Sequence, residues 1–198
     1  MTEVLLARHG QTTGLISGWW ADPSLSELGR AEARILARRL HSDGPIAALY
    51  CSPLKRARET AEIVAGPLGL RVVVCPDLRE IDMRLIGELG AFLVARKVAE
   101  LRHPPAPLAP VLRWPHTERP REYVARVGRP LDEIVLRHQG ERVLVVSHAG
   151  TIRALLAHYF PSETERWWAT AVRRCSVTRL QVASDRTVLL ALDDRPVR

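Results

Sequence analysis

The sequence predicts a single α/β domain of three layers, in which a mainly parallel, twisted sheet is flanked by helices. Two observations predict this class. Short apolar runs alternate with segments of helical spacing along the 198 residues. The length is that of one domain with a sizeable core, and we find neither an internal repeat nor a linker. We therefore expect one domain over residues 1–198.

Six stretches have the length and composition of β-strands. The first is apolar throughout and is bounded by polar residues, which is typical of a strand buried on both faces of a sheet. The last two alternate weakly and suit a closing hairpin with a turn around 183–186. The six ranges are 4–7, 46–51, 71–75, 143–146, 176–182 and 187–192.

Helices are expected between these strands. Ser24 or Ser26 can cap the first helix, and Glu27 favours its positive end. Ser52 and Pro53 are expected to be the N-cap and first residue of the second helix, which Gly69 ends. The expected helical ranges are 25–40, 52–68, 88–101, 121–138 and 151–159.

A proline-rich stretch separates the third and fourth of these helices. Residues 103–121 contain six prolines, which exclude a regular helix or strand pairing. We interpret 103–121 as a long loop packed over the domain and 83–121 as an insertion that covers the substrate. Trp114 and His116 belong either to such a flap or to a passive packed loop.

Composition narrows the function classes. The net charge of +7 comes almost entirely from arginine and would attract anions, but the arginines are scattered rather than gathered in one run, which argues against a nucleic-acid partner. Cys51, Cys75 and Cys175 are far apart, so a disulfide framework is not expected. No apolar run approaches the roughly 18 residues of a membrane span, and the N-terminus lacks a secretory signal pattern. We expect a cytoplasmic protein with no membrane partner.

Two of the predicted strands end at a histidine. Arg8, His9 and Gly10 follow the first strand, while Ser147-His148-Ala149-Gly150 follows the fourth. Ligands of open α/β sheets bind outside the carboxyl ends of the strands. Arg56 falls in the first turn of the helix after another strand, and helix N-termini favour anions. The sheet is therefore expected to present two histidines and two arginines to a phosphoryl group.

Transfer of a phosphoryl group also needs a proton for the leaving oxygen. Glu80, in the segment Leu78-Arg79-Glu80-Ile81-Asp82, is the candidate acid. Asp82, Glu88 and Glu118 are alternatives.

Five segments carry a resemblance to a known family. They occur in the family's order and cover most of the chain. Residues 6–12 read LARHGQT, 23–29 PSLSELG, 52–61 SPLKRARETA, 78–81 LREI and 147–150 SHAG. The sequence thereby resembles the histidine phosphatase superfamily, which is also called the phosphoglycerate mutase-like family.

The resemblance implies a role for each matched residue. His9 would attack phosphorus and become phosphorylated, and Glu80 would protonate the leaving group and then act as the base for water. Neither a metal nor another cofactor is implied. The residues implied to bind the substrate are Arg8, Gly10, Gln11, Thr12, Arg56, His148 and Ala149.

Departures from the family pattern leave the five catalytic positions intact. Leu15 stands where asparagine is frequent, and the segments 83–88 and 115–119 differ from the family's usual residues. These positions alter the walls of the site, so the substrate stays open. Trp19 and Trp20 either line the entrance or pack, whereas Trp167 and Trp168 are expected to pack.

We therefore expect a metal-independent phosphatase acting on a phosphorylated small molecule. The alternatives are a phosphoglycerate mutase, a protein that binds a phosphorylated ligand without catalysis, a nucleic-acid-binding domain and a protein phosphohistidine phosphatase. A homodimer is left open.

Overall fold

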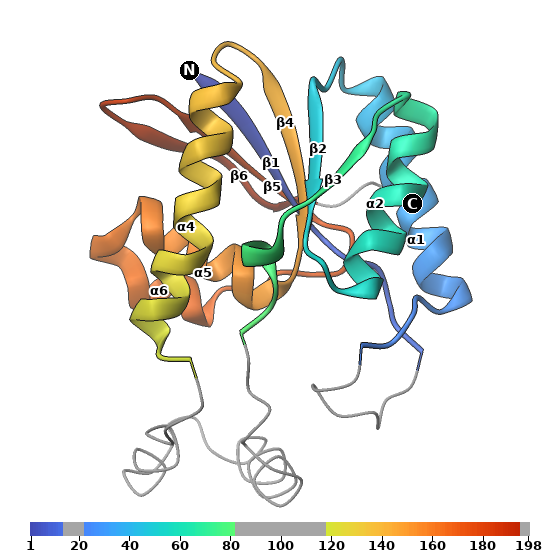
Figure 1. Cartoon of the computed structure of the whole chain (residues 1–198), viewed down its shortest axis with the longest axis horizontal. Helices are drawn as coiled ribbons and strands as arrows, with labels where there is room; N and C mark the ends of the chain where they lie inside the picture. The colour runs from blue at the N-terminus through green and yellow to red at the C-terminus, as the bar shows by residue number, and fades with distance from the viewer. Residues whose placement is uncertain (14–21, 82–117, 195–198) are drawn as a thin grey trace, which may run out of the picture.

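The computed structural model describes residues 1–13, 22–81 and 118–194, and these form a six-stranded mixed sheet between helices (Figure 1). The strand order is β3-β2-β4-β1-β5-β6, with β1 to β4 parallel and the β5–β6 hairpin antiparallel. The strands are β1 (Thr2–Arg8), β2 (Ala48–Cys51), β3 (Val72–Val74), β4 (Arg142–Ser147), β5 (Val177–Val182) and β6 (Thr187–Asp194). The α/β class and all six predicted strands are confirmed.

Helices cover both faces of the sheet. Helices α1 and α2 lie together on one side, and α4, α5 and α6 lie on the other (Figure 1). The α-helices are α1 (Glu27–Ser42), α2 (Lys55–Leu68), α4 (Pro120–Arg137), α5 (Ala149–Tyr159) and α6 (Thr164–Ala169), and the 3-10 turns are η1 (Pro76–Leu78) and η4 (Pro161–Glu163).

Strand β1 shows why the layers form. Its side chains alternate between the two faces, and all four central ones are fully buried. Val4 and Leu6 join the core under α4 and α5, whereas Leu5 and Ala7 join the core under α1 and α2. The four central residues of β1 are all apolar and therefore pack into the cores on both faces of the sheet.

The helix ends confirm two predicted signals and correct a third. The Ser26 hydroxyl accepts the Gly29 N–H at 3.0 Å and caps α1, and Gly69 ends α2 with a φ of 64°. The prediction that Ser52 and Pro53 begin α2 was wrong, because Leu54 is the N-cap residue and the helix begins at Lys55. The Ser52 hydroxyl instead bonds the ring of His148.

Two other helix starts differ slightly from expectation. Helix α4 begins at Pro120 rather than at residue 121, because proline's fixed φ suits the first helical position. Helix α5 begins at Ala149, two residues earlier than expected, and the short helix α6 was not predicted. Trp167 on α6 is buried against Phe160, as expected of a packing residue.

Several predictions fall outside the described residues. These are the helix over 88–101, nearly all of the insertion 83–121 with its loop 103–121, and the expectations for Leu15, Trp19, Trp20, Asp82, Glu88, Trp114 and His116. In the ranges that are described, none of the helices combines the length and the apolar composition of a membrane span.

The loop after β1 is pressed against the start of α1. The Ser26 N–H donates to Gln11 O at 2.9 Å, so the two backbones touch. A methyl group on Gly29 would lie inside contact distance of Gln11 O, and one on Gly10 would lie 2.5 Å from Gly29 O. In both cases the contacted atoms belong to the backbone, so no flexible side chain could move aside to make room.

We therefore expect Gly29→Ala to lower the free energy of unfolding by about 1–3 kcal/mol, the usual cost of overpacking a tight contact. Chemical denaturation measures this difference. Gly66→Ala on α2 is the matched control, because an added methyl group there meets nothing within 4 Å. It should be neutral or stabilising, since alanine favours helix more than glycine. Equal stabilities for the two variants would contradict the role assigned to this contact.

Candidate active site

The carboxyl ends of three parallel strands meet at one edge of the sheet. Strand β4 lies between β1 and β2, and its register pairs Ser147 with Arg8 and Val146 with Cys51. The residues that follow the strand ends are therefore level with one another. The His9 N–H donates to Ser147 O at 3.0 Å, and the rings of His9 and His148 lie 5.1 Å apart between centroids. The structure thus brings the two predicted histidines together.

His9 is held in one tautomer. Its Nδ1 lies 2.7 Å from Gly10 O, and because a carbonyl oxygen only accepts, Nδ1 carries the hydrogen and leaves a lone pair on Nε2. Burial lowers the pKa of His9 to about 3, and the charges of Arg56, Arg8 and Arg174 act in the same direction against the Gly10 hydrogen bond. The ring is therefore neutral at ordinary pH and can act as a nucleophile.

His148 is fully buried and presents an unsatisfied nitrogen. Its Nε2 lies 2.7 Å from the Ser52 hydroxyl, whereas its Nδ1 has no hydrogen-bond partner in the described part of the chain. Burial lowers the pKa of His148 well below its ordinary value, and His9, Arg56 and Arg8 add to this. A buried nitrogen without a partner is costly, and an oxygen atom of a bound ligand would satisfy it.

Two arginines provide the positive charge. Arg8 donates from Nη1 to Val172 O at 2.7 Å, and its Nε is buried without a partner among the described residues. Arg56 Nη1 lies 3.5 Å from a carboxylate oxygen of Asp22, and only 11% of the Arg56 side chain is exposed. Burial is the largest cause that lowers the pKa of each guanidinium. Fixed planar donors of this kind suit the oxygens of a phosphoryl group.

The Glu80 carboxylate lies against the start of α5, where it contacts Gly150, the second residue after His148. Its Oε2 accepts the Gly150 N–H at 3.2 Å, and its Oε1 accepts the Tyr123 hydroxyl at 2.7 Å. The carboxylate also acts electrostatically on both Arg8 and Arg56, so it shares their surroundings. Glu80 therefore joins the two histidines and two arginines at the same strand ends.

Of the alternative acids, only Glu118 is described. Its two oxygens accept hydrogen bonds from Arg126 Nε and Nη2 at 2.6 and 2.7 Å. This two-pronged ion pair occupies the carboxylate and leaves Glu80 as the better-placed acid.

The remaining predicted binding residues shape the loops around the site. Gly10 N–H donates to the Thr60 hydroxyl at 3.2 Å. The Gln11 side chain accepts a hydrogen bond from Ser26, and Thr12 pairs with Leu25 in a β-bridge. These contacts fix the loop after β1 and do not involve either histidine. Ala149 is the first residue of α5 and lies between His148 and Gly150.

Sequence reasoning missed several contributors. Ser52 was expected as a helix cap, not as the partner of His148, and Tyr123 lies 43 residues from Glu80 with no local motif to identify it. Arg174 is exposed, and its charge reaches both Arg8 and His9. The next residue, Cys175, donates its N–H to Arg8 O at 3.0 Å, which ties this segment to the site.

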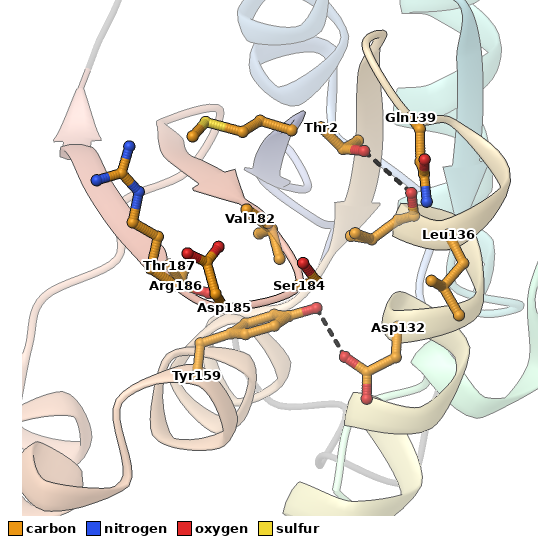
Figure 2. A pocket seen from close by; sticks show the side chains of 13 residues that line it. Thr2, Asp132, Leu136, Gln139, Tyr159, Val182, Ser184, Asp185, Arg186 and Thr187 are labelled. Atoms are coloured by element: carbon orange, nitrogen blue, oxygen red, sulfur yellow. Dashed lines mark hydrogen bonds between the residues drawn. The ribbon is translucent and has the colours of Figure 1, made fainter.

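A cavity of about 560 Å³ lies at the opposite edge of the sheet, between the β5–β6 turn and the end of α5 (Figure 2). There the Tyr159 hydroxyl donates to Asp132 at 2.9 Å. The cavity is separated by the length of the strands from His9, so it does not belong to the site. Within the described ranges, no three His, Cys, Asp or Glu side chains are arranged to hold a metal ion.

Comparisons with known proteins agree with this geometry. Residues 4–195 match the model of the histidine phosphatase superfamily (branch 1). The chain is 34% identical to phosphoglycerate mutase-like protein 4 of Arabidopsis thaliana, over 81% of this chain and 72% of the relative. It is 35% identical to the metal-independent phosphoserine phosphatase of the same plant, over 78% of this chain and 67% of the relative.

Solved structures give the same result. Bacillus stearothermophilus YhfR has a TM-score of 0.81 at 28% identity, covering 98% of both chains. A mycobacterial glucosyl-3-phosphoglycerate phosphatase in complex with VO3 has a TM-score of 0.78 at 26% identity, covering 97% of this chain and 99% of that one. The strand-end histidines, the fold and the match over nearly the whole chain place this protein in the histidine phosphatase superfamily.

Proposed function

We propose that this protein is a phosphatase that hydrolyses a small-molecule phosphomonoester through a phosphohistidine on His9, with Glu80 as general acid and base. The observation that carries the proposal is the neutral His9 ring, whose hydrogen is committed to Gly10 O and whose Nε2 is free to attack. His148 and the two arginines provide donors for phosphoryl oxygens. No metal ion is required, in keeping with the relative that is named metal-independent.

The first half of the reaction transfers the phosphoryl group to the protein. The Nε2 lone pair of His9 attacks phosphorus, and the bond between phosphorus and the leaving oxygen breaks. The electron pair stays on that oxygen, which takes the proton of Glu80 and departs as an alcohol. Arg8 and Arg56 balance the charge on the phosphoryl oxygens during the transfer.

The second half releases phosphate. A water oxygen attacks phosphorus while the Glu80 carboxylate takes a proton from that water. The bond between phosphorus and nitrogen breaks, and its electron pair returns to His9 Nε2. Inorganic phosphate leaves, and both residues are restored to their starting protonation states.

The substrate is proposed to carry a carboxylate beside its phosphate. Arg174 is exposed next to the site, and within the described part of the chain no carboxylate forms an ion pair with it. Two relatives are named for phosphoserine and glucosyl-3-phosphoglycerate, each of which has a carboxylate near the phosphate. An exposed guanidinium at this position suits such a group.

The central test is phosphate release from 4-nitrophenyl phosphate in EDTA. His9→Ala should lower turnover by at least about 10³-fold, because it removes the nucleophile. His41→Ala, at the exposed end of α1, is the control and should retain normal turnover. Turnover that survives in His9→Ala would overturn the proposed mechanism. If wild type turns over a phosphoglycerate only with its bisphosphate, the mutase alternative replaces it.

Arg174→Gln tests the substrate class. We expect KM for phosphoserine or 3-phosphoglycerate to rise about tenfold, since a charge-assisted contact would be lost, and KM for 4-nitrophenyl phosphate to change little. Arg173→Gln is the matched control, because the adjacent Arg173 is paired with Asp193. An equal rise for the aryl substrate would show that Arg174 does not select a carboxylate.

His9 should also make stability depend on pH. Its folded pKa of about 3 lies below the unfolded value of 6.5, so the unfolded chain binds more protons as pH falls. The free energy of unfolding should therefore be highest above pH 6.5 and fall toward pH 3, with a contribution from this residue of up to about 1.4 kcal/mol per pH unit. Denaturant titrations from pH 7 to 4 should show a shallower decline in His9→Gln. An unchanged slope would contradict a neutral buried ring.

A further inference from the structure

The two carboxylate oxygens of Glu80 are not equivalent. Oε1 accepts two hydrogen bonds, from the Tyr123 hydroxyl at 2.7 Å and from the Ile81 N–H at 3.1 Å. Oε2 accepts one, from the Gly150 N–H at 3.2 Å. Because a carboxylate oxygen has two lone pairs, Oε1 is saturated and Oε2 keeps one position open.

The Tyr123 hydroxyl keeps its proton and can therefore donate a hydrogen bond. Tyr123 is fully buried on α4, and burial together with the charge of Glu80 raises the pKa of its hydroxyl. That hydroxyl also lies 2.8 Å from the Thr151 hydroxyl. The other acceptor near Thr151 is Arg79 O at 3.4 Å, which is a long contact. Thr151 therefore donates to the Tyr123 oxygen, and the single hydrogen of Tyr123 goes to Glu80.

We propose that Tyr123 is a positioning residue that determines which oxygen of Glu80 carries the transferred proton. By occupying Oε1, it leaves Oε2 to give a proton to the leaving oxygen and to take one from water. Oε2 is the oxygen that accepts the Gly150 N–H, in the first turn of α5 just after His148. The inference rests on the proposed function, in which Glu80 is the acid and base.

The expected effect of Tyr123→Phe follows from the negative charge of the Glu80 carboxylate, which accepts the hydrogen bond of the tyrosine. A hydrogen bond to a carboxylate is about twice as strong as one to a neutral acid, so losing the Tyr123 hydroxyl favours protonated Glu80. In Tyr123→Phe, the pH profile for hydrolysis of an alkyl phosphate should move upward by about 0.5–1 unit. Among the described residues, Arg8 on β1 and Arg56 on α2 interact electrostatically with Glu80, and the variant leaves both in place.

The leaving group separates positioning from general damage. With phosphoserine, whose alkoxide needs a proton, kcat for Tyr123→Phe should fall about tenfold at nearly unchanged KM. With 4-nitrophenyl phosphate, whose leaving group needs little protonation, formation of the phosphoenzyme in a single turnover should fall less than about threefold. Tyr159→Phe is the matched control, since it removes a hydroxyl that donates to Asp132 at the opposite edge of the sheet (Figure 2).

Thr151→Val provides a second variant that keeps the tyrosine. Removing the donor to the Tyr123 oxygen should weaken the bond to Glu80 slightly and move the profile upward by a smaller amount than Tyr123→Phe. A downward shift would mean that Tyr123 donates to Thr151 when Glu80 is protonated, and this would overturn the fixed direction. Identical profiles for Tyr123→Phe and Tyr159→Phe would overturn the proposal as a whole.

Glu80→Gln distinguishes failure of this inference from failure of the proposed function. If Glu80→Gln slows phosphoserine hydrolysis about 10²-fold or more and Tyr123→Phe resembles its control, only the inference fails. If Glu80→Gln leaves the hydrolysis of both substrates unchanged, Glu80 is not the acid and both proposals fail together.

Discussion

The parallel pairing of β1 with β4 is the constraint on which the site depends. Its register places Arg8 opposite Ser147, and the His9 N–H continues the ladder by donating to Ser147 O. The two histidines thereby leave neighbouring strands at the same height, although they are far apart in the sequence. A slip of one residue would turn each strand-end side chain to the other face. Packing opposes that slip, because successive side chains of β1 and β4 already fill the cores on opposite faces of the sheet.

Once these groups are level, burial decides their chemistry. Desolvation is the largest cause that lowers the pKa of His9, His148, Arg8 and Arg56. The histidines respond by staying neutral, and the arginines stay charged because guanidinium keeps its proton in proteins. The carboxylates of Asp22 and Glu80 act against desolvation by raising the pKa of Arg56. The result is a group of side chains at the strand ends with surplus positive charge and two neutral histidines, which favours a dianionic ligand.

The parts of this arrangement that are local in sequence could be predicted. Strand runs, the Ser26 cap and the Gly69 stop depend on residues within one or two turns of chain. The partners of the proposed catalytic groups are not local: Arg8 donates to Val172 O across 164 residues, and the Tyr123 hydroxyl donates to Glu80 across 43. The start of α2 was misplaced for the same reason. Ser52 has the pattern of an N-cap, but its hydroxyl bonds His148, which lies 96 residues away.

Gly150 belongs to a motif that the sequence identified, but the structure gives a different physical reason for a glycine at this position. A glycine just after a strand-end histidine commonly allows a ligand to approach the backbone closely. In the fold, Glu80 fills that space, because its Oε1 lies 2.2 Å from the position that a Cβ of residue 150 would take. The lack of a side chain also exposes the Gly150 N–H, which donates to Oε2. A side chain at this position would push the carboxylate away from the start of α5 and from Tyr123. The glycine after the second histidine is therefore needed to seat the acid, and its effect on the ligand is indirect.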